Sequence, residues 1–216
     1  MSFISYISEN RSWIIELSLQ HIELSILTVL SAAFLAVPIG ILATRSRKIA
    51  FVSMNLANFG QSIPTFGVIG LMIPLFGIGF KPAIIALLLI AFLPILRNTC
   101  AGISAVDPAV IEAGRGMGMT EKQILFMIEL PLAVPVIFAG IRTATVMTIS
   151  TATLAALIGA GGLGELVFRG IEMYDSKILL AGGICLAAMA IAADQIMGMV
   201  EKMLSSGRGK EAADVF

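Results

Sequence analysis

A polar stretch decides the fold: Glu112-Ala113-Gly114-Arg115-Gly116-Met117-Gly118, followed ten residues later by Ile128-Glu129-Leu130-Pro131. Apolar runs long enough to cross a membrane lie on both sides of it. A membrane protein that keeps a polar, helix-forming segment between its spans exposes that segment to water on one side of the bilayer. We therefore expect the stretch to be a docking surface for a soluble partner.

The composition places the chain among all-α integral membrane proteins. Hydrophobic residues make up 58% of the 216 residues, charged residues make up 13%, and the mean hydropathy is +0.98. A helix needs roughly 20 apolar residues to span a bilayer, and the alternation typical of barrel strands is absent from the sequence. About five segments are predicted spans: 24–42, 52–76, 82–96, a run that starts between 131 and 141 and ends near 158, and 178–200.

The distribution of Lys and Arg predicts the orientation, because basic loops stay on the cytoplasmic side. Basic residues follow the first, third and fifth predicted spans: Arg45, Arg47, Lys48, Arg97, Arg115, Lys122, Lys202, Arg208 and Lys210. We expect a multi-pass protein of a bacterial-type cytoplasmic membrane, with its N-terminus outside and its C-terminus inside. The expected parts are an extracellular interfacial segment (1–20), a transmembrane domain (21–200) with a cytoplasmic loop (100–131) and an external loop (159–177), and a cytoplasmic tail (201–216).

The cytoplasmic loop begins with signals for a short helix and a turn. Asp107 offers a side-chain acceptor to the first free N–H groups, and Pro108 suits the first helical position because its missing N–H costs nothing there. We expect a helix from Pro108 to about Arg115. Gly116 and Gly118 then supply a turn that a β-carbon would hinder.

A second helix is predicted directly after this turn. Thr120 and Gln123 have the spacing of a capping box, and the helix should run towards Pro131. The product is a helix-turn-helix projection whose apolar anchors are Met117, Met119, Leu125 and Phe126. An ordinary amphipathic connector between two spans is the alternative interpretation.

The loop resembles the E-A-A-x3-G-x9-I-x-L-P loop of ABC importer permeases. The matching residues are Glu112-Ala113-Gly114, then Gly118 after three residues, Ile128 after nine more, and Leu130-Pro131 after one more. Gly114 is the one departure, since the family pattern has a second Ala there. The resemblance implies a type I ABC importer permease fold in which this loop is the coupling helix that fits a cytoplasmic ATPase. By position, the implied ATPase-coupling residues are Glu112, Ala113, Gly114, Gly118, Met117, Met119, Leu130 and Pro131.

Other phrases resemble the permeases that import glycine betaine, carnitine or choline. They include residues 61–65, 78–87, 93–99, 140–144 and 151–164. The resemblance implies an osmoprotectant importer subunit in the lipid bilayer, working with cytoplasmic ATPase subunits, a second identical or paralogous permease and an extracytoplasmic substrate-binding protein. It implies no nucleic-acid partner. A permease for another small substrate such as methionine is the alternative, and an ion-coupled secondary transporter is a remote one.

The sequence predicts no enzyme, and no catalytic, cofactor-binding or metal-ligating group. No Gly-x4-Gly-Lys-Ser/Thr motif is present, so ATP and Mg would be bound by the separate ATPase. The G-x-G-x-x-G match at residues 159–164 follows a predicted membrane span rather than a strand, so we interpret it as an external turn. Glu165, Arg169, Glu172 and Asp175 beyond it are candidate contacts for the binding protein, or else a solvated loop.

Polar residues within the spans are the remaining candidates, since such residues often mark pathways. Candidates for lining the pathway are Gln61, Ser62, Pro64, Asn98, Thr99, Thr151 and Thr153. Hydrogen bonding within the spans is the alternative role for these side chains. Arg142 and Asp194 both lie towards the cytoplasmic ends of their spans, and we expect them to form an ion pair or to reach the headgroups. Only Trp13 and two tyrosines accompany the phenylalanines, so tight binding of a quaternary ammonium is expected to reside in a partner.

Overall fold

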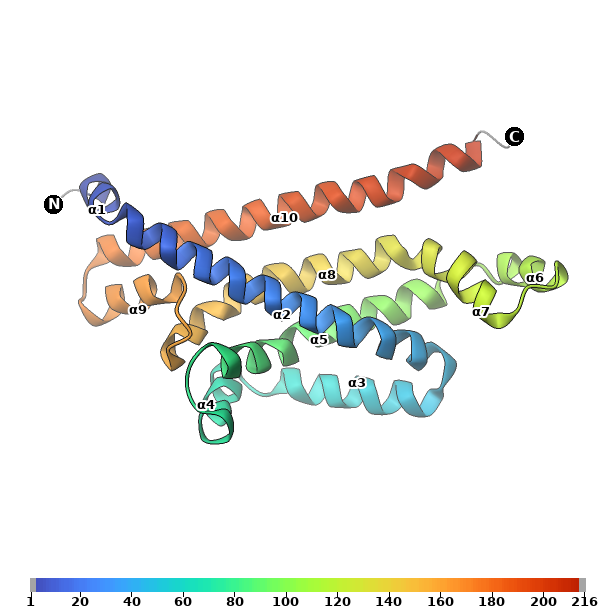
Figure 1. The fold of residues 1–216 in the computed structure, drawn as a ribbon, viewed down its shortest axis with the longest axis horizontal. Helices are drawn as coiled ribbons and strands as arrows, with labels where there is room; N and C mark the ends of the chain where they lie inside the picture. Colours follow the sequence, from blue (N-terminus) through green and yellow to red (C-terminus); the bar gives the residue numbers. More distant parts are fainter. Residues whose placement is uncertain (1–2, 214–216) are drawn as a thin grey trace.

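The computed structural model describes the backbone of residues 3–213 and the side chains of residues 5–204. All secondary structure in these residues is helical (Figure 1). The elements are α1 (Phe3–Glu9), α2 (Arg11–Arg45), α3 (Arg47–Ser62), α4 (Thr65–Phe76), α5 (Phe80–Ser104), α6 (Pro108–Gly116), α7 (Glu121–Ile124), the π-helical η1 (Leu125–Glu129), α8 (Leu130–Ala152), the 3-10 helix η2 (Thr153–Ile158), α9 (Gly164–Glu172) and α10 (Ser176–Ala213).

Four continuous helical stretches in the described residues are long and apolar enough to cross a membrane: α2, α5, residues 121–158 and residues 176–204. The first is longer than the sequence analysis predicted. No helix end falls at residue 20, since α2 begins at Arg11 and buries Ile14 and Leu17 against Leu163 and Leu166. Likewise α10 continues through residue 201 to Ala213, so no helix end separates the last span from the predicted tail.

The predicted second span at 52–76 is sharply bent in the structure. The segment is divided into α3 and α4, which are bent by 99° relative to each other. Pro64 causes the break, because its ring disfavours the helical conformation of the preceding residue. Ile63 accordingly has φ −78° and ψ 127°. The hydropathy of the segment is continuous across this point, so the pattern of apolar residues alone did not reveal the bend.

The central helix α5 is held closely between α2 and α8. A β-carbon at Gly40 of α2 would lie 2.7 Å from Thr99 Cβ, and one at Gly140 of α8 would lie 2.5 Å from Asn98 Cβ. Small residues permit this approach of helix backbones, as is common between helices in membranes. The third span also extends past the predicted 82–96, and Arg97 donates to Asn58 Oδ1 of α3 at 2.6 Å.

The molecule has two distinct ends (Figure 1). At one end, α6 and α7 project beyond the long helices, on the same side as the C-terminal part of α10. At the other end lie α1, α4 and α9. We call these the α6–α7 end and the α9 end. Each end contains a group of residues that is a candidate functional site.

Candidate functional site

The start of α6 follows from its capping residues, as predicted. The Asp107 side chain accepts a hydrogen bond from the backbone N–H of Ala109 at 2.8 Å, and Pro108 occupies the first turn. This cap satisfies one of the free N–H groups at a helix start. The helix therefore begins at a fixed point directly after the end of α5.

Gly118 ends α6. Its φ is +80°, and its N–H donates to the carbonyl oxygen of Arg115 at 2.9 Å, while the N–H of Met119 donates to that of Gly114 at 3.1 Å. These two bonds form a Schellman motif, which needs a left-handed residue that glycine adopts without strain. Gly116 is different from the prediction, because it is helical and a β-carbon there would meet nothing within 4 Å. Gly118 alone makes the turn.

A capping box then restarts the chain as α7. Thr120 Oγ1 accepts from the N–H of Gln123 at 3.4 Å, and Gln123 Oε1 accepts from the N–H of Thr120 at 2.8 Å. The helix continues without interruption through η1 into α8, where the N–H of Leu130 donates to the carbonyl of Leu125. The predicted second helix is thus the first part of a single helical stretch that crosses the molecule.

Gly114 joins α6 to this helical stretch. It is buried, and a β-carbon there would lie 2.8 Å from Ile128 Cδ1 and 3.4 Å from Met119 Sδ. Both atoms are at the ends of flexible side chains, so an alanine could be accommodated by a small movement of Ile128. The difference from the E-A-A pattern therefore leaves the packing of the two helices intact.

Several side chains at this end are exposed. Glu112, Ala113 and Met117 are exposed, and Met117 reaches 75% exposure. We define the α6–α7 surface as Val110, Glu112, Ala113, Met117, Phe126 and Met127. Exposed apolar side chains on an element that also exposes a carboxylate are suited to a protein partner. Of the predicted coupling residues, Gly118 borders this surface, whereas Gly114 and the half-buried Met119 lie beneath it.

Leu130 and Pro131 do not belong to that surface. Both are half-buried, and Leu130 packs against Ile103 of α5 and Ile137 of α8. The π-helical turn directly before them contains one more residue per hydrogen-bonded ring than an α-helix. The Leu-Pro pair therefore forms the joint between the projecting element and the bundle.

An ion pair at the same joint was missed in the sequence. Glu129, which is 3% exposed, pairs with Arg45 at the end of α2. A buried carboxylate is costly unless a partner compensates its charge. The acidic residue within Ile128-Glu129-Leu130-Pro131 and the basic run at residues 45–48 were the available signals, but 84 residues separate the two partners.

Arg115 and Glu121 form a second, exposed ion pair across the turn between α6 and α7. Arg115 Nε lies 3.0 Å from Glu121 Oε1, and both side chains are more than half exposed. The hydrogen bond to Glu121 raises the pKa of the Arg115 guanidinium. Exposed pairs add little stability, so we attribute the geometry of the turn to Gly118 and the two caps.

The predicted pathway residues are not brought together into one site. Gln61 Nε2 donates to the Ile90 carbonyl of α5 at 3.0 Å, while Ser62 bonds within its own helix. Thr99 is fully buried between helices, so no surface of this chain exposes it. The remaining candidates are Pro64 at the α3–α4 bend, Asn98 packed on Gly140, Thr151 bonded to Met147 of its own helix, and Thr153 at the start of η2.

Arg142 and Asp194 lie together between α8 and α10. Arg142 Nε and one terminal nitrogen donate to the two oxygens of Asp194 at 2.7 and 2.9 Å. The other terminal nitrogen donates to Glu201 Oε2 at 2.9 Å. This fork geometry satisfies a guanidinium with two carboxylates. Gly198 lies directly over the guanidinium, where a β-carbon would be 3.1 Å from Arg142 Cζ.

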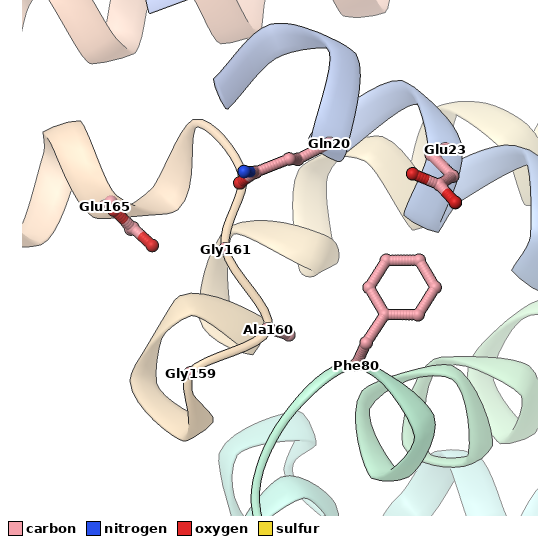
Figure 2. Close-up of a pocket in the computed structure, with 7 residues that line it drawn as sticks. All are labelled: Gln20, Glu23, Phe80, Gly159, Ala160, Gly161 and Glu165. Carbon is pink, nitrogen blue, oxygen red and sulfur yellow. The ribbon is translucent and has the colours of Figure 1, made fainter. Parts of the chain in front are cut away.

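A cavity of about 430 Å³ opens at the α9 end (Figure 2). Its lining comes from four separate parts of the chain: Gln20 and Glu23 of α2, Phe80 of α5, the turn 159–161, and Glu165 of α9. Figure 2 shows Glu23 next to the Phe80 ring, with Glu165 on the far side of the turn. The sequence analysis did not find this cavity, because its parts are distant in sequence.

Left-handed glycines shape the wall of this cavity. Gly159, Gly161 and Gly162 have φ values of +72°, +77° and +87°. A β-carbon on Gly161 would overlap Gln20 Oε1, the same atom that accepts the N–H of Gly162 at 3.1 Å. The G-x-G-x-x-G match therefore encodes a turn pinned to α2, in agreement with its interpretation as a turn rather than a nucleotide site. Across the described part of the chain, no group of three His, Cys, Asp or Glu is arranged to hold a metal.

Comparison with known proteins identifies the family. Residues 36–206 match the model of the binding-protein-dependent transport system inner membrane component. The chain belongs to this family. The permease is 39% identical to the carnitine transport permease protein OpuCB of Listeria monocytogenes over 99% of this chain and 98% of that protein. It is 38% identical to the choline transport system permease protein OpuBB of Bacillus subtilis (94% and 93%) and 41% identical to the osmoprotectant import permease protein OsmW of Salmonella typhimurium (95% and 98%).

Solved structures show the same fold. The permease superposes on a chain of the inward-facing MetNI methionine ABC transporter with a TM-score of 0.80, at 20% identity over 91% of this chain and 98% of that one. A chain of an amino acid ABC transporter gives 0.79 at 19% identity over 94% and 99%. The expected type I importer permease fold is thereby confirmed, and the chain is a transport component of the membrane rather than an enzyme.

Proposed function

We propose that this permease is the membrane-spanning subunit of an ATP-driven importer of osmoprotectants, namely glycine betaine, carnitine, choline or a related quaternary amine. The observation that carries the proposal is the similarity along nearly the whole chain to permeases named for these compounds. The solved methionine transporter shares the fold at 20% identity, which is too distant to favour methionine as the substrate.

The α6–α7 surface is the docking site for the ATPase in this proposal. Glu112, Ala113 and Met117 contact the ATPase, while Gly114 and Gly118 shape the helix that presents them. The support is a capped helix with an exposed carboxylate and exposed apolar side chains at the position of the E-A-A loop. Arg45 and Glu129 tie this element to α2, so a displacement of α6 is passed to the first span as well as to α8.

The α9 end faces the outside and receives the substrate-binding protein. This orientation is supported by the basic residues that cluster at the other end. Glu172 is exposed and available to a partner, whereas the Arg169 guanidinium lies 5.0 Å from the centre of the Trp13 ring. A second permease, identical or paralogous, completes the pathway, since the chain's own polar candidates do not line a common cavity.

Assembly and transport test the coupling role. We expect Glu112→Lys to abolish co-purification of the ATPase and ATP-driven uptake into proteoliposomes, because it reverses the charge of the docking surface. Glu16→Lys makes the same charge change on the exposed surface of α2 near the α9 end and should assemble normally. Normal assembly and uptake with Glu112→Lys would disprove the docking site.

Uptake by the intact transporter tests the substrate class. Proteoliposomes that hold the permease and its ATPase, supplied with the cognate binding protein, should accumulate at least one of glycine betaine, carnitine or choline when ATP is enclosed. Methionine serves as the control substrate and should not accumulate. Methionine uptake without uptake of any quaternary amine would overturn the assignment of substrate while leaving the family intact.

A further inference from the structure

The cavity at the α9 end places one aromatic ring, Phe80, among acidic side chains. Phe80 and Ala160 belong to an apolar cluster that continues into the bundle. Glu23 of α2 lies next to the Phe80 ring, and Glu165 of α9 lines the cavity on the far side of the turn 159–161. The volume of about 430 Å³ falls within the range of roughly 300–1,000 Å³ typical of small-molecule sites.

Neither carboxylate is neutralised by a neighbour. Among the side chains of residues 5–204, Glu23 and Glu165 take part in none of the ion pairs. Arg169, one helical turn from Glu165, has its guanidinium over the ring of Trp13 instead. Lys81 follows Phe80 but is exposed and does not line the cavity. The cavity therefore carries two negative charges that no basic lining residue compensates.

Specific contacts hold the wall of the cavity in place. Gln20 uses its side-chain oxygen to hold the N–H of Gly162, and only a glycine fits at position 161 beside that oxygen. The N–H of Gly79 also donates to the Ile158 carbonyl at 2.6 Å, which fixes the start of α5, and hence Phe80, against the same turn. Four parts of the chain are thus locked in a geometry that leaves the cavity open.

We propose that this cavity binds the quaternary ammonium group of the transported amine, with the Phe80 ring against its methyl groups, Glu23 as the adjacent counter-charge and Glu165, across the turn, as a more distant negative charge. An aromatic ring and nearby carboxylates are the groups that attract such a cation. The proposal rests on the proposed function and adds a site within the permease itself, at the end where the binding protein releases its cargo.

The two carboxylates also make the site selective. Choline carries a positive charge and no carboxylate, whereas glycine betaine carries its own carboxylate close to the ammonium group. Repulsion between that carboxylate and the two acidic side chains offsets part of the attraction. The cavity accordingly prefers choline to glycine betaine, and the preference depends on Glu23 and Glu165.

Direct binding without the binding protein tests the site. The complete permease–ATPase complex in nanodiscs is titrated with choline and, separately, with glycine betaine, followed by saturation-transfer NMR. We expect choline to bind with a Kd on the order of 1 mM and glycine betaine to bind more weakly. Glu23→Gln with Glu165→Gln should weaken choline binding about tenfold and reduce the difference between the two compounds.

Two further variants separate this site from general effects. Glu9→Gln with Glu16→Gln removes the same charge from exposed positions at this end and should leave choline binding unchanged. Phe80→Leu should weaken choline binding about threefold. Absence of choline binding by the wild type, or equal weakening by both double variants, would overturn the proposal. The uptake assay distinguishes the two proposals. If the transporter takes up an amine but the permease does not bind choline, only the proposed binding site is rejected. If the permease binds choline but no amine is taken up, the proposed function is rejected.

Discussion

At the α6–α7 end a single left-handed glycine, Gly118, ends a helix in open space, whereas at the α9 end two left-handed glycines, Gly161 and Gly162, lie directly against α2. The first position needs glycine only for its backbone angle. Gly161 and Gly162 must be glycine for steric reasons as well, because a β-carbon at these positions would overlap Gln20 and His21. The turn at the protruding end is thus shaped by local conformation, and the cavity wall at the other end is shaped by tertiary packing as well.

The strongest way to test this contrast is Gly164→Ala at the α9 end. A β-carbon there would overlap the carbonyl oxygen of Thr153 and lie 2.9 Å from Ala156 Cβ. Because backbone cannot move aside cheaply, we expect a loss of about 3 kcal/mol in stability, measured by thermal unfolding in detergent. Gly183→Ala in α10, where the β-carbon meets nothing within 4 Å, is the matched control. An equal, small effect of both changes would contradict the packing argument.

Removing one ion-pair partner tests the α6–α7 end next. Arg45→Ala leaves the carboxylate of Glu129 buried without a counter-charge, and we expect a loss of about 2 kcal/mol, because the side chain of Arg45 is itself partly exposed. Adding Glu129→Gln to this variant should recover much of the loss. Arg47→Ala, at an exposed neighbour, should be nearly neutral in the same unfolding measurement. A double variant as unstable as Arg45→Ala would mean that packing, and not charge, dominates here.

A smaller effect is expected from the backbone angle alone. Gly118→Ala forces a residue with a β-carbon into the left-handed region and should cost about 1–2 kcal/mol. Gly116→Ala, only two residues away but helical, should instead stabilise α6 by about 0.5–1 kcal/mol. Unfolding curves of the two variants should therefore shift in opposite directions. Shifts of the same sign would show that the turn is not held by Gly118.

The smallest effect is expected at the departure from the family pattern. Gly114→Ala requires only that Ile128 Cδ1 move, so its cost should remain below about 1 kcal/mol, and the ATPase should still co-purify. Loss of the ATPase with this variant would show that Gly114 is in the docking contact and not merely beneath it.

Local signals allowed the α6–α7 end to be predicted from sequence, and the α9 end largely escaped prediction. Asp107, Pro108, Thr120 and Gln123 act on groups within three residues of themselves, so their caps were recognisable without a structure. The cavity depends on residues near 20, 80, 160 and 165, and the Arg45–Glu129 pair links two distant helices. The periodicity of apolar residues along a short stretch of sequence cannot predict contacts between residues so far apart.

Apolar runs predicted the number of spans better than their shape. The hydrophobic pattern of residues 52–76 identified a membrane segment, but only the conformational restriction that Pro64 imposes on Ile63 explains the 99° bend. Arg142 and Asp194 were paired by their depth in the two spans, which proved close enough for a forked contact, while Glu201 as a second partner was not foreseen.

Helix α2 has a mechanical consequence, since it is attached at both ends. Gln20 holds the turn at the α9 end, and Arg45 holds Glu129 at the other. The 25 steps between Gln20 and Arg45 make a lever of about 38 Å, on which a tilt of about 5° displaces the far end by about 3 Å, the length of a hydrogen bond. Pro38 lies between them and interrupts the backbone hydrogen bonding of the helix. A small tilt of α2 would therefore be enough to break or form a hydrogen bond at its far end.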